Sequence, residues 1–278
     1  MSTREQRINA AQQTLSAFEA GYYMSDGRKV EVSGLHRNSM NQITLHTPES
    51  IDSIEINNVA NDHEPVYKLI PLPVVSALSE LKVRDSIGIL NFASAKNPGG
   101  GFLNGAQAQE ESLAMCGNLY LTQIKKPEYY HANRVCNSML YTDYMIYSKD
   151  VVFIREDTNE FWRKPMIASV LTAPAVNMGQ YLLKENANIS HAETVMKDRM
   201  RKILKVFASQ GDKTLILGAY GCGVFRNDPK TIAGFFVDLL KGEDLESHFQ
   251  ELIFAVYDSS KSKNVYNAFE QVLRPFIS

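Results

Sequence analysis

Three consecutive glycines, Gly99–Gly101, are followed after seven residues by Gln109, Glu110 and Glu111. Glycines without side chains let a ligand contact the main chain directly, and a carboxyl group beside such a loop can give a proton to a leaving group or take one from water. Each feature alone is common, because glycine runs form flexible loops and adjacent glutamates are usually solvated. Their combination predicts a catalytic site.

A second glycine-rich segment, Gly218–Phe225, lies between an expected strand at 214–217 and a helix start at Asp228-Pro229. Backbone amides in such a loop can bind a diphosphate. Its spacing, G-x-x-G-x-G, is neither the dinucleotide fingerprint nor a P-loop, which disfavours a dinucleotide-dependent oxidoreductase. A nucleophilic Cys222 would need a base, commonly histidine, and none is near in sequence, so we expect a small buried cysteine.

The elements that position these loops are expected to alternate between strand and helix. Continuous apolar runs predict buried strands, helix starts are indicated by S-x-x-E at Ser190 and by Asp228-Pro229, and residues 125–148 are expected to form a long tyrosine-rich loop. Such alternation is typical of a layered α/β domain with its binding site at strand ends. The expected strands are 87–93, 151–154, 166–172, 214–217 and 252–257, and the expected helices start near 109, 190 and 229 or span 265–273.

The segment before residue 85 has a different composition. Apolar residues at Ile8, Ala11, Leu15, Phe18 and Tyr22 predict an amphipathic helix, and the polar residues 25–64 predict irregular structure. We therefore expect an accessory region, 1–84, packed on a catalytic domain, 85–278.

Composition excludes several classes of protein. The chain has 278 residues, a formal charge of −2 and no long basic run, which disfavours sequence-specific nucleic-acid binding. Three cysteines without CxxC, and histidines without HxxxH, disfavour a disulfide framework and a metal site. The polar N-terminus and the absence of a long apolar run predict no signal peptide and no membrane span, and an intracellular, cytoplasmic location, with the nucleus open for a eukaryotic protein.

The first loop with its Gln-Glu-Glu resembles the signature of the poly(ADP-ribose) glycohydrolases, and the stretch Asn91–Pro98 before it resembles their microbial branch. Gly218–Phe225 and Phe254–Asp258 resemble the second phosphate loop and the last strand of the same domain. The resemblance covers about residues 85–260. It implies a three-layer, macrodomain-like α/β/α fold with a mixed sheet, and hydrolysis of the ribose–ribose bond of poly(ADP-ribose) without a cofactor or metal.

The resemblance also implies roles for individual residues. Glu111 is the expected acid/base, and Glu110, grouped with it as catalytic, is expected to hold ribose hydroxyls. Two carboxyl groups on opposite sides of a glycosidic bond lie about 5 Å or more apart, so adjacent glutamates do not suit that pair of roles. The expected substrate-binding residues are Asn91, Asn97, Gly99, Gly100, Gly101, Gln109, Gly221, Cys222, Gly223, Val224 and Phe225.

Two other functions use the same loops. A mono-ADP-ribosyl hydrolase would act on modified protein or nucleic acid. A non-catalytic reader of ADP-ribose would need the phosphate loop but would have no chemical need for Glu111. The expected partners are poly(ADP-ribose) or ADP-ribosylated protein, with ADP-ribose as product.

Overall fold

A seven-stranded mixed sheet forms the centre of the computed structural model, which describes residues 3–56, 64–81, 86–156, 160–185 and 188–277. The strand order is β3-β6-β7-β5-β8-β9-β4. β6 pairs antiparallel with both β3 and β7, and the other neighbours are parallel. The strands are β3 (Ile43–His46), β4 (Val66–Ile70), β5 (Ile87–Ala93), β6 (Met145–Arg155), β7 (Phe161–Pro174), β8 (Thr214–Leu217) and β9 (Glu251–Ala255).

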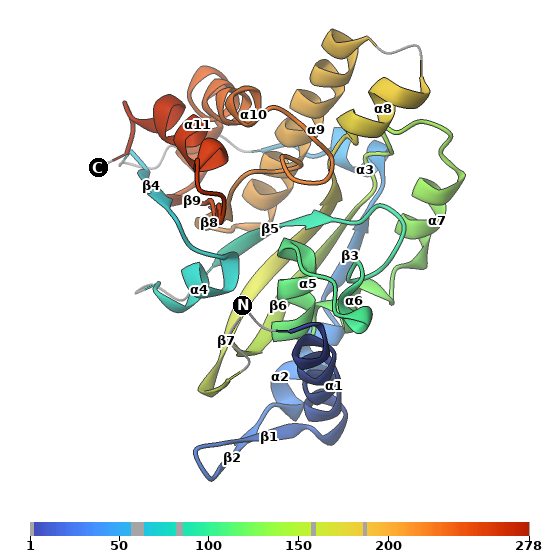
Figure 1. Cartoon of the computed structure of the whole chain (residues 1–278), viewed down its shortest axis with the longest axis vertical. Coiled ribbons are helices and arrows are strands. Elements are labelled where there is room, and N and C mark those ends of the chain that lie inside the picture. Colours follow the sequence, from blue (N-terminus) through green and yellow to red (C-terminus); the bar gives the residue numbers. More distant parts are fainter. Residues whose placement is uncertain (1–2, 57–63, 82–85, 157–159, 186–187, 278) are drawn as a thin grey trace.

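Helices cover both faces of this sheet (Figure 1). Two hydrophobic clusters, one on each face, hold the layers together, and the central strands are largely apolar, as is typical where both faces of a strand are covered. The layers confirm the expected α/β/α fold with a mixed sheet. One face packs against α3 (Pro48–Asp52), α8 (Met178–Lys184), α9 (Ile189–Gln210), α10 (Pro229–Val237) and α11 (Asn264–Leu273); the other packs against α1 (Arg4–Ala20), α4 (Val74–Ser79), α5 (Gln109–Cys116) and α6 (Leu119–Gln123).

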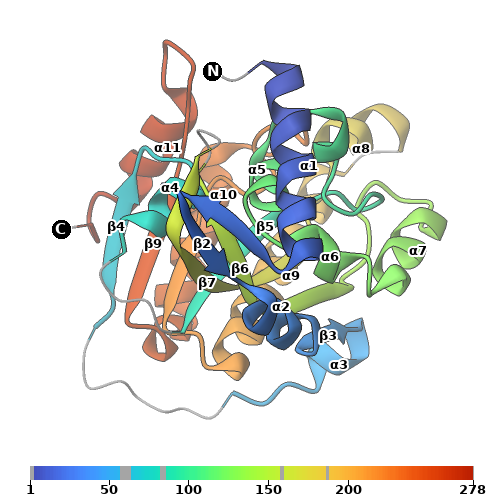
Figure 2. The same cartoon turned by 90° about the horizontal axis from the view of Figure 1, so that it is seen from below.

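The described residues before position 85 are more regular than expected, and two of their strands are part of the sheet. They supply its two edge strands, β3 and β4, so the expected boundary at 84/85 cuts through one continuous sheet. Before β3, the chain forms α1, a hairpin of β1 (Tyr22–Ser25) and β2 (Arg28–Glu31), and α2 (Ser33–Met40), all outside the seven-stranded sheet. Figure 2 shows α2 beside α6.

Two local expectations are corrected by the structure. Residues 125–148 are not one long loop, because α7 (Pro127–Val135) begins with a proline at its first turn, a position that proline favours, and β6 starts at Met145. The helix at 190 is capped by Asn188 rather than Ser190, since the Asn188 side chain accepts a hydrogen bond from the His191 amide at 3.2 Å.

Within the described ranges, no helix has the length and apolar character needed to cross a membrane.

A buried arginine on α9 fixes the segment between α7 and β6. The Arg199 side chain is 1% exposed, and it donates to Asp143 Oδ1 at 2.7 Å and to the carbonyl oxygens of Leu140 and Pro174 at 2.8 and 3.0 Å. Its donors therefore tie residues 140–143 to the end of β7.

Replacing this arginine should destabilise the protein far more than replacing a surface arginine on the same helix. Arg199→Met leaves buried carbonyls without donors and leaves Asp143 paired with Lys202 alone, and breaking such a buried pair costs about 3–5 kcal/mol. Arg201→Met removes a more exposed ion pair with Glu243 and should cost about 1 kcal/mol or less. Urea unfolding of both variants measures this; equal losses would contradict the role given to Arg199.

Candidate active site

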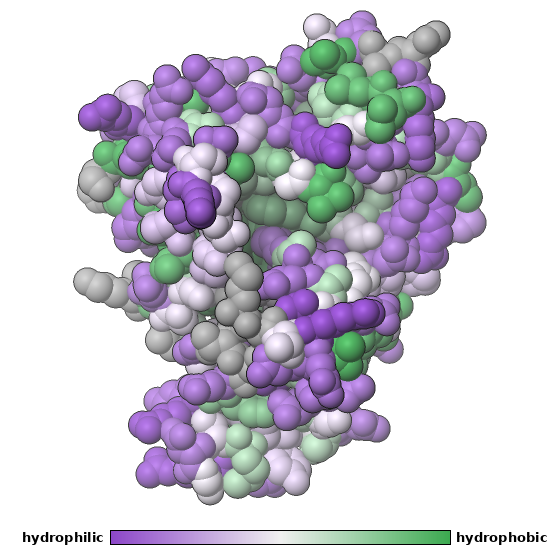
Figure 3. All heavy atoms as spheres, in the orientation of Figure 1, coloured by the Kyte–Doolittle hydropathy of each residue, from purple (hydrophilic) through white to green (hydrophobic). Residues whose placement is uncertain are grey.

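Both glycine-rich loops lie at the carboxyl ends of central strands of the sheet. β5 and β8 are parallel neighbours, so the loops that follow them leave from the same side. The Phe92 and Tyr220 rings, one from each loop region, are 5.7 Å apart. On the face drawn in Figure 3, the surface is hollowed between α5 and the loop after β8, with apolar side chains in the floor. The structure thus brings together two segments that are more than a hundred residues apart in the sequence.

The first loop folds back on itself over the start of α5. Gly99 and Gly100 have φ values of +63° and +58°, a backbone conformation that favours glycine. A Cβ at Gly100 would lie 2.3 Å from Glu111 Oε1, so the carboxylate occupies the space that a side chain would take. The Asn97 side chain is exposed on this loop and makes no hydrogen bond to any described residue. Glycine is thus required for the loop to lie directly against Glu111.

The Glu111 side chain is half-buried at the first turn of α5. Its Oε1 accepts a hydrogen bond from the Gly101 amide at 2.9 Å. Oε2 has no hydrogen-bond partner within the described ranges. One carboxylate oxygen is therefore held by the glycine loop and the other is available to a ligand.

The Glu110 side chain points into the protein instead. It is 3% exposed, and its carboxylate accepts hydrogen bonds from Gln123 Nε2 at 2.9 Å, Asn91 Nδ2 at 3.1 Å and the Ser94 amide at 2.6 Å. Burial raises the pKa of Glu110 to about 8, the nearby Glu111 charge acts in the same direction, and the three donors oppose the shift. The carboxyl group is enclosed by protein groups, and the expected contact with ribose hydroxyls stays a prediction.

Two further residues that were expected to bind substrate are also engaged by the protein. Asn91 is fully buried, and its amide donates to Glu110 and Thr172. The Gln109 side chain accepts from the Phe92 amide at 2.8 Å and donates to the Leu90 carbonyl at 2.7 Å, as a neighbouring strand would. In this structure both residues fix α5 to the end of β5.

The sequence analysis missed Gln123, which connects the first loop to Glu110. It is fully buried at the end of α6, accepts from the Gly99 amide at 2.7 Å and donates to Glu110. Its position continues the apolar face expected for a helix from 109 to about 124. The structure instead breaks that helix at Gly117, where a Cβ would lie 2.7 Å from the Val152 carbonyl, and α6 takes a new direction. A polar residue on the new inner face could not be identified from periodicity.

The second loop presents unpaired amides. The N–H groups of Gly221, Gly223, Val224 and Phe225 make no hydrogen bond to the part of the chain that the structure describes. Asn227, which the sequence analysis missed, holds the loop from below by donating to the carbonyls of Val176 and Gly221 at 2.8 and 3.0 Å. Several free amides on one loop form a concave site for an anion.

The two positions that flank Cys222 differ in whether the fold requires a glycine there. Gly221 has a φ of +72°, and a Cβ there would lie 2.6 Å from the Asn227 amide nitrogen. Gly223 has ordinary backbone geometry, and a Cβ there meets nothing within 4 Å. Of these two positions, only 221 requires glycine for the fold itself, and a side chain at 223 would project into open space.

The side chains of the second loop have distinct surroundings. Cys222 is partly buried, donates to the Tyr220 carbonyl at 3.6 Å, and has a pKa raised by burial, the opposite of an activated thiol. Val224 is 86% exposed. The Phe225 ring lies 6.0 Å from the ring of Tyr141, which the Arg199 contacts hold in place. Val224 and the Phe225–Tyr141 pair thus give the loop an apolar rim.

Among the residues with described positions, no group of three or more His, Cys, Asp or Glu side chains is arranged to hold a metal ion.

Comparison with known proteins adds an independent observation. The family described as microbial-type PARG, catalytic domain, matches residues 11–156. A crystal structure of poly(ADP-ribose) glycohydrolase from Thermomonospora curvata superposes with a TM-score of 0.92 at 30% identity, covering 96% of this chain and 99% of that one. The Deinococcus radiodurans enzyme in complex with ADP-ribose gives 0.83 at 35% identity, covering 88% and 99%. No curated protein compared with the chain matches it.

Because the pKa of Glu110 is raised on folding, the free energy of unfolding should depend on pH. A carboxyl group whose pKa rises from 4.5 to about 8 on folding stabilises the fold fully below pH 4.5 and loses this contribution as the pH rises through 8. The unfolding free energy of the native protein, minus that of Glu110→Gln, should therefore fall between pH 5 and 8, by at most about 1.4 kcal/mol per pH unit.

Denaturant unfolding without ligand across this range measures the difference. Asp212, whose pKa burial raises to about 6, is present in both proteins and cancels. A difference that stays constant or grows with pH would show that Glu110 is not destabilised as an anion.

Proposed function

The chain belongs to the microbial-type poly(ADP-ribose) glycohydrolase family, and from this premise we propose that it cleaves the ribose–ribose O-glycosidic bond of poly(ADP-ribose) with Glu111 as the acid/base. The observation that carries the proposal is the pairing of Glu111 Oε1 with the Gly101 amide, which leaves Oε2 free beside a loop without side chains. An acid/base must reach the scissile bond closely, and the glycine loop gives that access.

The proposed reaction uses one carboxyl group twice. The protonated Glu111 gives its proton to the leaving ribose oxygen as the bond from the anomeric carbon to that oxygen breaks. The anomeric carbon then has oxocarbenium-like character, which the substrate's own diphosphate can stabilise. Water adds to this carbon and gives a proton to the Glu111 carboxylate, which restores the acid. The products are ADP-ribose and a polymer shorter by one unit.

The second loop supports an ADP-ribose substrate through its backbone. The free amides of Gly221, Gly223, Val224 and Phe225 suit the two phosphates of ADP-ribose, since N–H groups on one concave loop bind anions without a net positive charge. Both the D. radiodurans structure with ADP-ribose and the T. curvata structure with the inhibitor ADP-HPD are of relatives that hold such a ligand.

Glu110 is proposed as a positioning residue. Its carboxylate joins α6, the end of β5 and the turn at Ser94, and it is adjacent in sequence to the residue that is proposed to react. Fixing Glu110 thereby fixes the first turn of α5 and the direction of the Glu111 side chain.

Substituting Glu111 should abolish turnover without preventing binding. Glu111→Gln keeps the size of the side chain but cannot transfer the proton, and loss of such a group typically slows a reaction by about 10²–10⁴-fold. Release of ADP-ribose from poly(ADP-ribose) measures turnover, and calorimetry with ADP-ribose measures binding.

Glu128→Gln, an exposed glutamate on α7, is the matched control and should be fully active. Turnover of Glu111→Gln close to that of this control would exclude the acid/base role.

The second loop should tolerate a change in its thiol but not added bulk. Gly223→Val should fold normally, because the protein leaves its Cβ unobstructed, yet it should weaken ADP-ribose binding by about tenfold or more by blocking approach to the amides. Cys222→Ser should keep most of the turnover, because Cys222 is not an activated thiol. The reverse pattern, an inactive Cys222→Ser with normal binding by Gly223→Val, would indicate a nucleophile site instead.

A further inference from the structure

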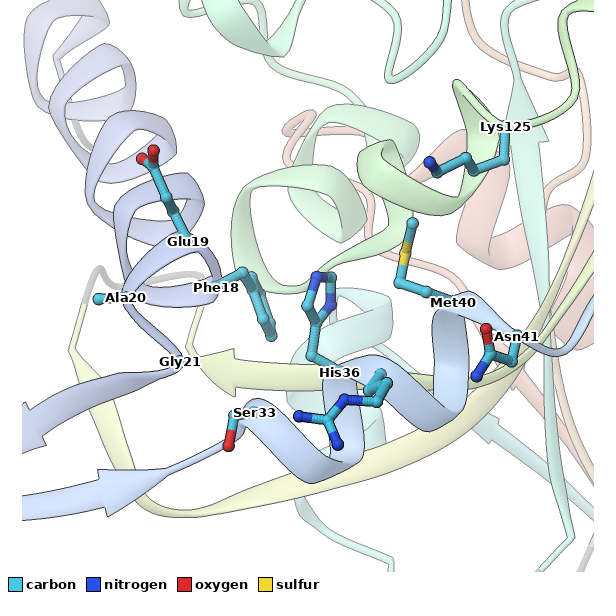
Figure 4. A pocket seen from close by; sticks show the side chains of 10 residues that line it. Phe18, Glu19, Ala20, Gly21, Ser33, His36, Met40, Asn41 and Lys125 are labelled. Carbon is cyan, nitrogen blue, oxygen red and sulfur yellow. The ribbon is translucent and has the colours of Figure 1, made fainter.

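A second cavity lies between the N-terminal helices and α6, apart from the strand ends that carry the glycine loops. Its volume is about 520 Å³, within the range of small-molecule sites. Figure 4 shows the end of α1 with Phe18 and Glu19 on one side, His36 and Met40 on α2 below, and Lys125 reaching in from the turn after α6. Three separate segments of the chain therefore line this open cavity.

The charges around this cavity are mainly positive, although the chain as a whole is negative. Arg37 and Lys125 line it, both are exposed, and neither forms an ion pair with any residue whose position is described. The one carboxylate in the lining is that of Glu19. Exposed cations without partners beside a cavity of this size are suited to an anionic ligand.

A partly exposed ring lies between these charges. The His36 ring packs at 5.1 Å and an angle of 38° on the ring of Phe18, which is 3% exposed and supports it from the interior, and Met40 adds a thioether beside it. His36 is partly buried, and burial lowers its pKa, so the ring is predominantly neutral at pH 7. A neutral ring and a thioether suit a flat, uncharged group such as a nucleobase, while Arg37 and Lys125 suit phosphates.

Both ends of α6 connect this cavity to the proposed active site. His36 Nδ1 lies 3.0 Å from the Asn118 side-chain amide at the N-cap of α6, and Lys125 follows the helix by two residues. Gln123, at the end of the same helix, holds the Gly99 amide and Glu110. The cavity and the first glycine loop are thus attached to one short helix.

We infer that this cavity binds a nucleoside diphosphate: Arg37 and Lys125 contact the phosphates, His36 and Met40 contact the base, and Glu19 accepts from ribose hydroxyls. On the proposed function, the source is a distal unit of the same poly(ADP-ribose) chain that is being cleaved. Such a unit would tether long polymers to the enzyme while the active site acts on another unit, and a short substrate could not use it.

The test compares substrates of different length in two charge-matched double variants. Arg37→Gln/Lys125→Gln removes the cations of the cavity. Arg28→Gln/Lys164→Gln removes the same charge from exposed positions on β2 and β7 that make no ion pair in the described structure. We expect the first variant to raise KM for long poly(ADP-ribose) about tenfold over the control, the effect of losing two exposed charge contacts. Its kcat, and its KM for a two-unit substrate, should match the control.

A calorimetric titration with free ADP-ribose separates the possible sources. A second, weaker binding event that is lost only in Arg37→Gln/Lys125→Gln would show that the cavity also takes the free nucleotide. One event in all proteins, together with the length-dependent KM effect, would show that only a polymer unit binds there. If the two variants give the same KM on long polymer and the same titration, the inference is overturned. Absence of hydrolysis of any substrate by the native protein would instead contradict the proposed function, and the titration would still test the cavity.

Discussion

The enclosure of the Glu110 carboxylate is the constraint on which the site depends. A carboxyl group that is 3% exposed is costly to bury unless hydrogen-bond partners surround it, and here they come from three places: the side chain of Asn91 on β5, the side chain of Gln123 on α6 and the backbone at Ser94. Because consecutive side chains on a helix point in different directions, Glu111 faces outward when Glu110 is buried. Any rearrangement that exposed Glu110 would also move the residue next to it.

In this arrangement, side chains make the hydrogen bonds of the interior, and main-chain groups supply the donors at the surface of the site. Gln109, Glu110, Asn91 and Gln123 form hydrogen bonds inside the protein. The polar groups on the side of the hollow are the glycine backbone, the free oxygen of Glu111 and the unpaired amides of the second loop. Because the donors there belong to the main chain, they are held in place by the fold and cost little reorganisation when charge develops.

The sequence predicted the parts of the fold that local patterns determine. The apolar runs marked β5, β8 and β9, and the Asp228-Pro229 pair marked the start of α10, where Asp228 does accept from the Thr231 amide. Features that arise from long-range contacts could not be found this way. Gln123 is oriented by the break at Gly117, and β3 and β4 are short polar-flanked strands that take their identity from the sheet edge they join. The spacing of Gln109-Glu110-Glu111 placed these residues correctly at the start of α5, but it did not show which of them face inward.

The most direct measurement is the product analysis of length-defined poly(ADP-ribose) incubated with the native protein, beside a protein that carries a single ADP-ribose. Free ADP-ribose should accumulate as the polymer shortens if Glu111 is the proton donor and the unpaired amides of the second loop bind the diphosphate, as proposed. Polymer that stays intact in the presence of folded protein that binds ADP-ribose would contradict glycosidic cleavage. Release of ADP-ribose only from the singly modified protein would contradict the assigned substrate.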